Sequence, residues 1–156
     1  MSEEFSKGLI KTARTEKSEV MIHLETQSIQ DGETQNLVQD VPGQFFNIGK
    51  TFYLRYQENL EDNEAATVTF KFSGEGEVQL TRQQGENRSR MFFVVDHQLE
   101  AHYQTPYGDL PLTTVTPRMN ITLGDYPVRG KISIDYGLFS QGQELGEYKI
   151  RLQFTA

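Results

Sequence analysis

Three charged residues stand at the ends of short segments in which apolar and polar side chains alternate. Glu58 and Arg82 each end such a segment, and Arg90 begins another. Arg82 shares its strand face with Val78 and Leu80, so the alternation predicts a guanidinium that points into the fold or lies at its lip. Because an unpaired buried charge is costly, we expect Arg82 to meet either Glu58 or an anionic ligand group held by paired hydrogen bonds.

The strand that begins at Arg90 has two apolar faces, and the pattern leaves its orientation open. If Phe92 and Val94 point inward, Arg90 does so too and joins Arg82. The residues of the opposite face are also apolar: Met91, Phe93 and Val95. If that face points inward, Arg90 lies outside.

The order of the strands brings further polar side chains to the end of the barrel that holds Arg82. In an up-and-down meander, alternate connections lie at one end of the sheet, which brings Glu58, Arg82 and Arg90 to one mouth. The strand over 99–105 returns to that mouth and is followed by Tyr107. We predict a ligand-binding site there, made of the following residues: Arg82, Arg90, Glu58, Tyr103, Thr105, Tyr107 and Tyr53. The alternative is a structural network of these side chains that plugs one end of a packed barrel.

The residue patterns typical of metal binding and of nucleophilic catalysis are missing from the sequence. It has no cysteine, and His97 and His102 are five residues apart, so a regular strand would turn them to opposite faces. Glu58 beside two arginines would have a lowered pKa, which makes it a poor general acid. We therefore predict no metal ion, no cofactor and no catalytic residue, and rank an enzyme third among the functions considered.

A period of two in hydrophobicity runs through the chain from Ser18 onward and predicts about eight to ten β-strands. The breaks between the strands are of hairpin length. We favour a closed antiparallel β-barrel over a sandwich, because no break is long enough for a Greek-key crossover and because closure removes exposed sheet edges. Residues 18–156 are expected to form this single domain. Residues 1–17 are expected to form an N-terminal extension, either a short helix or a frayed tail.

The net charge narrows the range of partners. The 156-residue chain carries a formal charge of −7, so it should be repelled by nucleic-acid backbones and by anionic membranes. Lys50 and Arg55 form the only basic stripe in the sequence pattern, and two cations are too few. The first residues look like neither a secretory signal nor a membrane anchor, and a chain free of cysteine suits a reducing compartment. We expect a cytoplasmic protein with no nucleic-acid or membrane partner.

Six short motifs follow one another along most of the chain. They are Tyr53-Leu-Arg-Tyr-Gln-Glu58, Thr69-Phe-Lys71, Leu80-Thr-Arg82, Met91-Phe-Phe93, Tyr103-Gln-Thr-Pro-Tyr-Gly108 and Thr113-Thr-Val-Thr116. In this order they resemble the YwiB-like family, small bacterial proteins of unknown function, over residues 19–154. The resemblance implies a calycin-like, or lipocalin-like, β-barrel in a bacterial cytoplasm, and it implies no activity. The segment up to Lys17 departs from the family pattern, as does the hairpin at 83–88.

Two functions fit these observations. The first is non-enzymatic binding of a small amphipathic or acidic molecule whose head contacts Arg82, because small barrels either fill with side chains or hold one small ligand. The alternative is a protein-interaction or assembly module with a solid core, and the chain would be a monomer or a homodimer. An empty, polar-lined cavity beside Arg82 would favour binding, whereas an interior packed by Phe and Tyr would exclude it.

Overall fold

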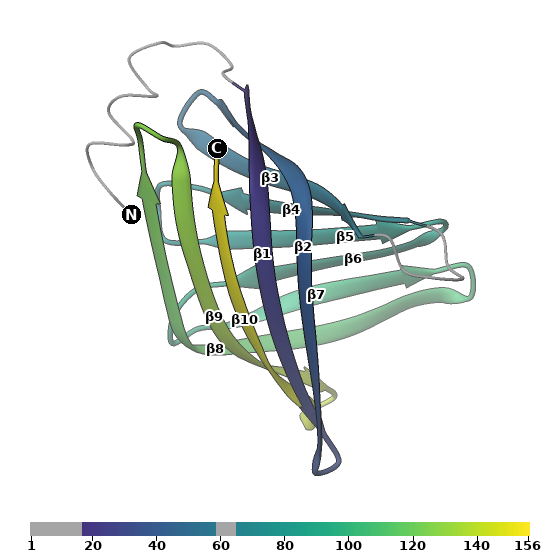
Figure 1. The fold of residues 1–156 in the computed structure, drawn as a ribbon. Coiled ribbons are helices and arrows are strands. Elements are labelled where there is room, and N and C mark those ends of the chain that lie inside the picture. Colours follow the sequence, from purple (N-terminus) through teal and green to yellow (C-terminus); the bar gives the residue numbers. More distant parts are fainter. Residues whose placement is uncertain (1–16, 59–64) are drawn as a thin grey trace.

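Ten antiparallel strands close into a barrel in the computed structural model, which describes residues 17–58 and 65–156 (Figure 1). Their bounds are β1 (Lys17–Gln30), β2 (Glu33–Ile48), β3 (Thr51–Glu58), β4 (Ala66–Phe72), β5 (Val78–Gln84), β6 (Asn87–Phe93), β7 (Gln98–Thr105), β8 (Gly108–Gly124), β9 (Arg129–Ser140) and β10 (Gln143–Thr155). Each strand pairs with its neighbours in the sequence, and β1 closes the barrel by pairing with β10. The predicted closed antiparallel barrel is therefore confirmed.

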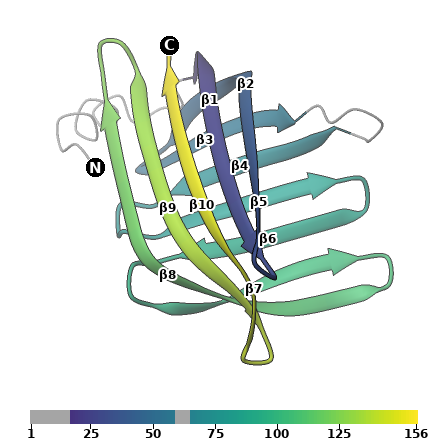
Figure 2. The ribbon, with the colours of Figure 1, turned by 60° about the horizontal axis from the view of Figure 1, so that its bottom comes forward.

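The hairpins at one end of the barrel point in two directions. In both views the β1–β2 and β9–β10 hairpins extend together, while the β5–β6 and β7–β8 hairpins point another way (Figure 1, Figure 2). The strand β8 links the two groups, because its first part pairs with β7 and its last part with β9, with a register shift between Val115 and Arg118. The end of the barrel between the two groups of hairpins is called the mouth below.

The sequence pattern does not predict β2. Its first half, residues 33–42, alternates poorly and ends in Pro42, which has no amide hydrogen to donate. On the side away from β1, pairing with β3 begins only at Gly43, so a residue without a donor is tolerated beside it. A Cβ atom at Gly43 would lie 2.5 Å from Cδ1 of Ile22 and 2.8 Å from the carbonyl oxygen of Arg55. Glycine is thus required where β2 approaches β3.

The inward-facing side chains change from aromatic to polar along the barrel. The register of β3 to β6 groups them in rows. From the closed end toward the mouth, the rows are Phe52, Phe72, Val78 and Phe93, then Leu54, Phe70, Leu80 and Met91, then Tyr56, Val68, Arg82 and Ser89. The first row is at most 2% exposed. The barrel is therefore packed solid at one end and becomes polar at the other.

The opposite wall, formed by β1, β9 and β10, shows the same change. One inward row there is buried and apolar: Leu24, Ile132 and Leu152. The row two steps nearer the mouth carries hydroxyl groups: Ser28, Tyr136 and Tyr148. Two facing walls thus place their polar side chains at the same end, so the interior has an apolar floor and a polar rim.

One expectation concerns residues outside the described ones. The predicted short helix or frayed tail covers residues 1–17, of which only Lys17, the first residue of β1, is described. Within residues 17–58 and 65–156, no helix has the length and hydropathy needed to span a membrane.

Candidate functional site

A cavity of about 270 Å³ lies inside the barrel at the mouth. Part of its lining is apolar and consists of Leu24, Val68, Phe70, Leu80, Met91 and Ile150. Its polar lining comes mainly from the rows nearest the mouth: Thr26, Gln27, Ser28, Tyr56, Glu58, Arg82, Ser89, Tyr136, Tyr148 and Lys149. A concave, largely apolar space with a few convergent polar groups has the character of a small-molecule site.

Glu58 and Arg82 form an ion pair in this cavity. Oε2 of Glu58 accepts hydrogen bonds from Nε and Nη2 of Arg82 at 3.4 and 3.2 Å, and Nη1 of Arg82 donates to Oε1 of Gln84 at 3.4 Å. The side chain of Glu58 is 14% exposed and that of Arg82 is 36% exposed. Alternation with Val78 and Leu80 predicted the inward orientation of Arg82, and the structure has it. Within the part of the chain described, these bonds engage three of the five guanidinium N–H groups.

Three tyrosines complete the polar side of the cavity, and the sequence analysis missed all of them: Tyr56, Tyr136 and Tyr148. The ring of Tyr136 stacks on that of Tyr148 with centroids 5.1 Å apart, and Gln30 donates a hydrogen bond to the hydroxyl of Tyr148. The alternation of strand faces could have revealed Tyr136, because it shares its face with the buried Ile132 and Ile134.

Burial changes the acidity of two of these phenols. It raises the pKa of Tyr136 above the usual value for tyrosine, with a smaller contribution from Tyr148. Burial also raises the pKa of Tyr56, and there the charge of Glu58 adds to the rise while that of Arg82 opposes it. Neither Tyr56 nor Tyr136 has a hydroxyl partner among the described residues. Two neutral phenols with free donors therefore line the cavity.

The structure places Arg90 outside the barrel, so the orientation with Phe92 facing inward is wrong. Met91 lines the cavity and Phe93 is fully buried in the row at the closed end. Because both faces of this strand are apolar, only the packing of Phe93 into the core decides between them. A single arginine therefore stands beside Glu58, in place of the two that were expected.

Two predicted tyrosines also lie away from the cavity. Tyr53 faces outward and stacks on Phe46 with ring centroids 5.1 Å apart. Its neighbours Phe52 and Leu54 occupy the inward face of β3. Tyr103 lies opposite Ser89 in the register but is exposed and does not line the cavity.

The remaining two predicted residues belong to the β7–β8 hairpin. Oγ1 of Thr105 donates to the carbonyl oxygen of Gly108 at 2.9 Å and accepts from the amide of Tyr107 at 3.1 Å. These bonds hold the turn together, and the Tyr107 side chain is fully exposed at its tip. Of the seven predicted residues, Glu58 and Arg82 are thus the two that meet in the cavity.

Comparison with known proteins places this barrel in a family. A match to DUF1934, described as a domain of unknown function, spans residues 22–152. The chain belongs to the DUF1934 family. It is similar to the crystal structure of the ywiB protein from Bacillus subtilis, with a TM-score of 0.77 and 22% identity over 94% of this chain and 97% of that one. This confirms the resemblance to YwiB-like proteins, and at this identity it shows the calycin-like fold alone. No curated protein matches the sequence.

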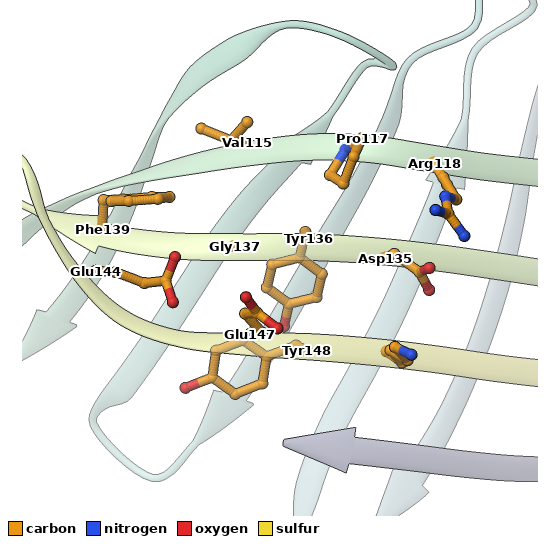
Figure 3. Close-up of a pocket in the computed structure, with 11 residues that line it drawn as sticks. Val115, Pro117, Arg118, Asp135, Tyr136, Gly137, Phe139, Glu144, Glu147 and Tyr148 are labelled. Atoms are coloured by element: carbon orange, nitrogen blue, oxygen red, sulfur yellow. The ribbon is translucent and has the colours of Figure 1, made fainter. Parts of the chain in front are cut away.

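The DUF1934 barrel also has a groove of about 330 Å³ along β8, β9 and β10, which shares Tyr136, Tyr148 and Lys149 with the lining of the internal cavity (Figure 3). Figure 3 shows Arg118 and Asp135 on neighbouring strands, whereas Glu144 and Glu147 lie farther along β10. Asp135 is already paired, since Nη1 of Arg151 lies 2.7 Å from its Oδ1. The charges are spread along the strands and do not converge on one point, so the internal cavity is the better candidate for a specific site.

Two of the three histidines of this DUF1934 chain have local partners. Nδ1 of His23 is hydrogen-bonded to Oδ1 of Asp40 at 2.7 Å, and Nδ1 of His97 lies 2.9 Å from the carbonyl oxygen of Val95. Over residues 17–58 and 65–156, no three His, Asp or Glu side chains are grouped so that they could hold a metal ion.

Proposed function

We propose that this DUF1934 protein binds a small amphipathic molecule with an anionic head in the mouth of its barrel, without chemical conversion. One observation carries the proposal: a guanidinium with unused donors stands in a cavity whose other walls are largely apolar. Arg82 is that group, and its hydrogen bonds to Glu58 and Gln84 leave two of its five N–H groups for a ligand. Arginine binds carboxylate, phosphate and sulfonate groups well because its fork of donors matches their paired oxygens.

The lining indicates how such a ligand would lie. Its apolar body would contact Leu24, Leu80 and Met91, and its head would reach Arg82. The free phenols of Tyr56 and Tyr136 would supply further hydrogen bonds to head-group oxygens. A volume of about 270 Å³ is just below the usual range for ligand pockets, so we expect one short chain or one ring system.

Glu58 has a specific part in this proposal. With no ligand bound, its carboxylate neutralises Arg82 and so lowers the cost of keeping a cation in a partly buried place. An anionic head would share Arg82 with Glu58 or take the donor that now reaches Gln84. The hydroxyl of an alcohol can accept a hydrogen bond from Arg82 but gains no attraction between opposite charges, so the site should prefer an acid over the corresponding alcohol.

The ionisable side chains of the cavity support binding over catalysis. The one carboxylate of the lining belongs to Glu58 and is engaged by Arg82. Ser28 and Ser89 also line the cavity, but no histidine does, so its lining lacks the Ser–His pair that commonly makes a serine nucleophilic.

Calorimetric titration with straight-chain carboxylates from hexanoate to dodecanoate, and with the corresponding alcohols, tests the proposal. We expect the acid of optimal length to bind about tenfold more tightly than its alcohol, which is the contribution of one charge-assisted hydrogen bond. The double variant Glu58→Gln/Arg82→Met should lose most of this preference for the acid, while Lys149, the other cation of the lining, stays unchanged. Both residues are changed because Arg82→Met alone would leave the Glu58 carboxylate unpaired in the cavity.

Two further variants make the result specific. Met91→Trp adds bulk inside the cavity and should abolish binding of the acid and of the alcohol alike. Arg118→Gln removes a cation from the outer surface and should change neither. Binding that survives Met91→Trp, or that responds equally to Arg118→Gln and to the double variant, would show that the ligands bind elsewhere and would overturn the proposal.

A further inference from the structure

The outer face of strands β3 to β6 carries cations and no acid. Among the residues of these four strands, the only acidic side chain is Glu58, which points inward to Arg82. The whole chain has a formal charge of −7, so its charges are strongly segregated. The outward cations of this face are Arg55, Lys71, Arg88 and Arg90.

The strand register arranges this face as a grid. One row across the sheet is Arg55, Thr69, Thr81, Arg90 and His102. The rows on either side of it are Gln57, Thr67, Gln83, Arg88 and Gln104, and then Tyr53, Lys71, Gln79 and Phe92. Adjacent strands lie about 4.8 Å apart and successive outward residues about 7 Å apart, so the four cations fall within a patch roughly 15 Å across. All its other described side chains are hydroxyls, amides, aromatics and one imidazole.

Two of the arginines on this face have unused donors. The Nε atoms of Arg88 and Arg90 are buried and have no hydrogen-bond partner among the described residues. Arg82 and Arg151, by contrast, each meet a carboxylate. Because these Nε atoms are buried, a phosphate would reach Arg88 and Arg90 through their outer Nη atoms, and no described carboxylate forms an ion pair with either arginine.

We propose that the outer face of β3 to β6 binds a single-stranded nucleic acid, with phosphates on Arg88 and Arg90 and a base stacked on Phe92. Flat sheet faces that combine cations, aromatic rings and neutral hydrogen-bonding groups hold single strands in this way. A duplex would not present its base faces to Phe92. A protein partner fits less well, because the face lacks the apolar centre of a typical protein interface.

The sequence-based expectation of no nucleic-acid partner rested on net charge and on a stripe of only Lys50 and Arg55. The other cations of the face are distant in the sequence and become neighbours only through the register of four strands. The face is also separate from the cavity, because its side chains alternate with the inward ones. Nucleic-acid binding is therefore independent of the ligand site proposed above.

Fluorescence anisotropy of the full chain with labelled 12-nucleotide oligo-dT and oligo-U tests this inference over a series of salt concentrations. Each phosphate neutralised on a single strand contributes about −0.7 to the slope of log affinity against log salt, so four cations predict a slope of about −3. The double variant Arg88→Gln/Arg90→Gln should weaken binding at least tenfold at low salt and make the slope shallower by about 1.4. Phe92→Leu should weaken binding and leave the slope unchanged.

The control variants separate this face from others. Arg118→Gln/Lys131→Gln removes two exposed outward cations from β8 and β9 and should leave affinity unchanged, as should the cavity variant Glu58→Gln/Arg82→Met. Urea unfolding should show all variants folded. The inference is overturned if neither oligonucleotide binds at low salt, or if Arg88→Gln/Arg90→Gln binds like the wild type. It is also overturned if poly-glutamate displaces the oligonucleotide as well as unlabelled oligonucleotide does, because the face would then recognise acidic protein.

Discussion

The guanidinium of Arg82 reaches the carboxylate of Glu58 across an entire strand. The pair joins β5 to β3, with Nη2 and Oε2 3.2 Å apart, and β4 lies between them. At this level the inward residues of β4 are Ala66 and Val68, whose small side chains leave room for the contact. The pair therefore links β3 to β5 across β4 at the mouth. It also lies in the cavity that we propose as the ligand site.

Removal of one partner of this pair should cost more than removal of both. Arg82→Met should lower the free energy of unfolding by about 1–2 kcal/mol, because it leaves the mostly buried Glu58 carboxylate unpaired, and the half-exposed position of Arg82 keeps the cost modest. Glu58→Gln/Arg82→Met should recover most of this loss, since neither charge of the pair remains. Urea unfolding at pH 7 measures both. Wild-type stability of Arg82→Met would contradict a structural contribution of the pair.

Gly43 should tolerate no side chain. Gly43→Ala places a methyl group 2.5 Å from Cδ1 of Ile22 and 2.8 Å from the backbone oxygen of Arg55, which cannot rotate away. We expect a loss of about 2–3 kcal/mol in the free energy of unfolding, as for overpacked cores. Gly74→Ala is the matched control, because a Cβ there meets nothing within 4 Å. Equal stability of the two variants would mean that β2 can shift away from β3 at little cost.

The β1–β2 hairpin should respond to pH through His23. The hydrogen bond to Asp40 raises the pKa of His23 above 6.5, partly offset by desolvation, and the charges of Asp40 and Glu25 add to the rise. The folded state thus holds the proton more tightly than the unfolded state. The resulting stabilisation is fully present below pH 6.5 and is lost as the pH rises through the folded pKa. An NMR titration of the His23 ring should show its midpoint falling in Asp40→Asn, and an unmoved midpoint would exclude Asp40 as the cause.

Strand parity accounts for what the sequence could predict of the cavity. Arg82 shares its strand face with two aliphatic residues, whereas the other face of the strand is polar. The pattern therefore assigns the inward direction to Arg82. The strand of Arg90 has large apolar side chains on both faces, and local pattern cannot decide which one the core takes. The decision lies in tertiary packing, where Phe93 completes the fully buried row beside Val78.

Other features needed the assembled barrel. β2 is polar over its first half and contains Pro42, so its residues have a low propensity for β-strands. It forms a strand nevertheless, because it pairs with β1. The basic face of β3 to β6 has no local signal, because its cations come from three strands. Chain direction led us to expect Thr105 and Tyr107 at the mouth, but it carries no information on the turn hydrogen bond that Thr105 accepts from the Tyr107 amide.

Tyr56 and Tyr136 should make the protein sensitive to alkali. Burial raises the pKa of both phenols above 10, so the folded state keeps their protons when the unfolded state loses them. Their contribution to stability is fully present below pH 10 and is lost as the pH rises from there toward the folded pKa, with a slope of at most about 1.4 kcal/mol per pH unit for each tyrosine.

Urea unfolding between pH 9 and pH 11 tests this dependence with Tyr136→Phe. The Tyr136 hydroxyl has no partner among the described residues, so its removal should change stability little at pH 7 and make the alkaline slope shallower. Tyr107→Phe removes a hydroxyl that is exposed to water in the folded state as in the unfolded, and should leave the slope as it is in the wild type. If Tyr136→Phe and the wild type lose stability in parallel above pH 10, water reaches the Tyr136 hydroxyl through the mouth and stabilises the phenolate. The cavity would then be wetter, and less suited to an apolar ligand, than its lining indicates.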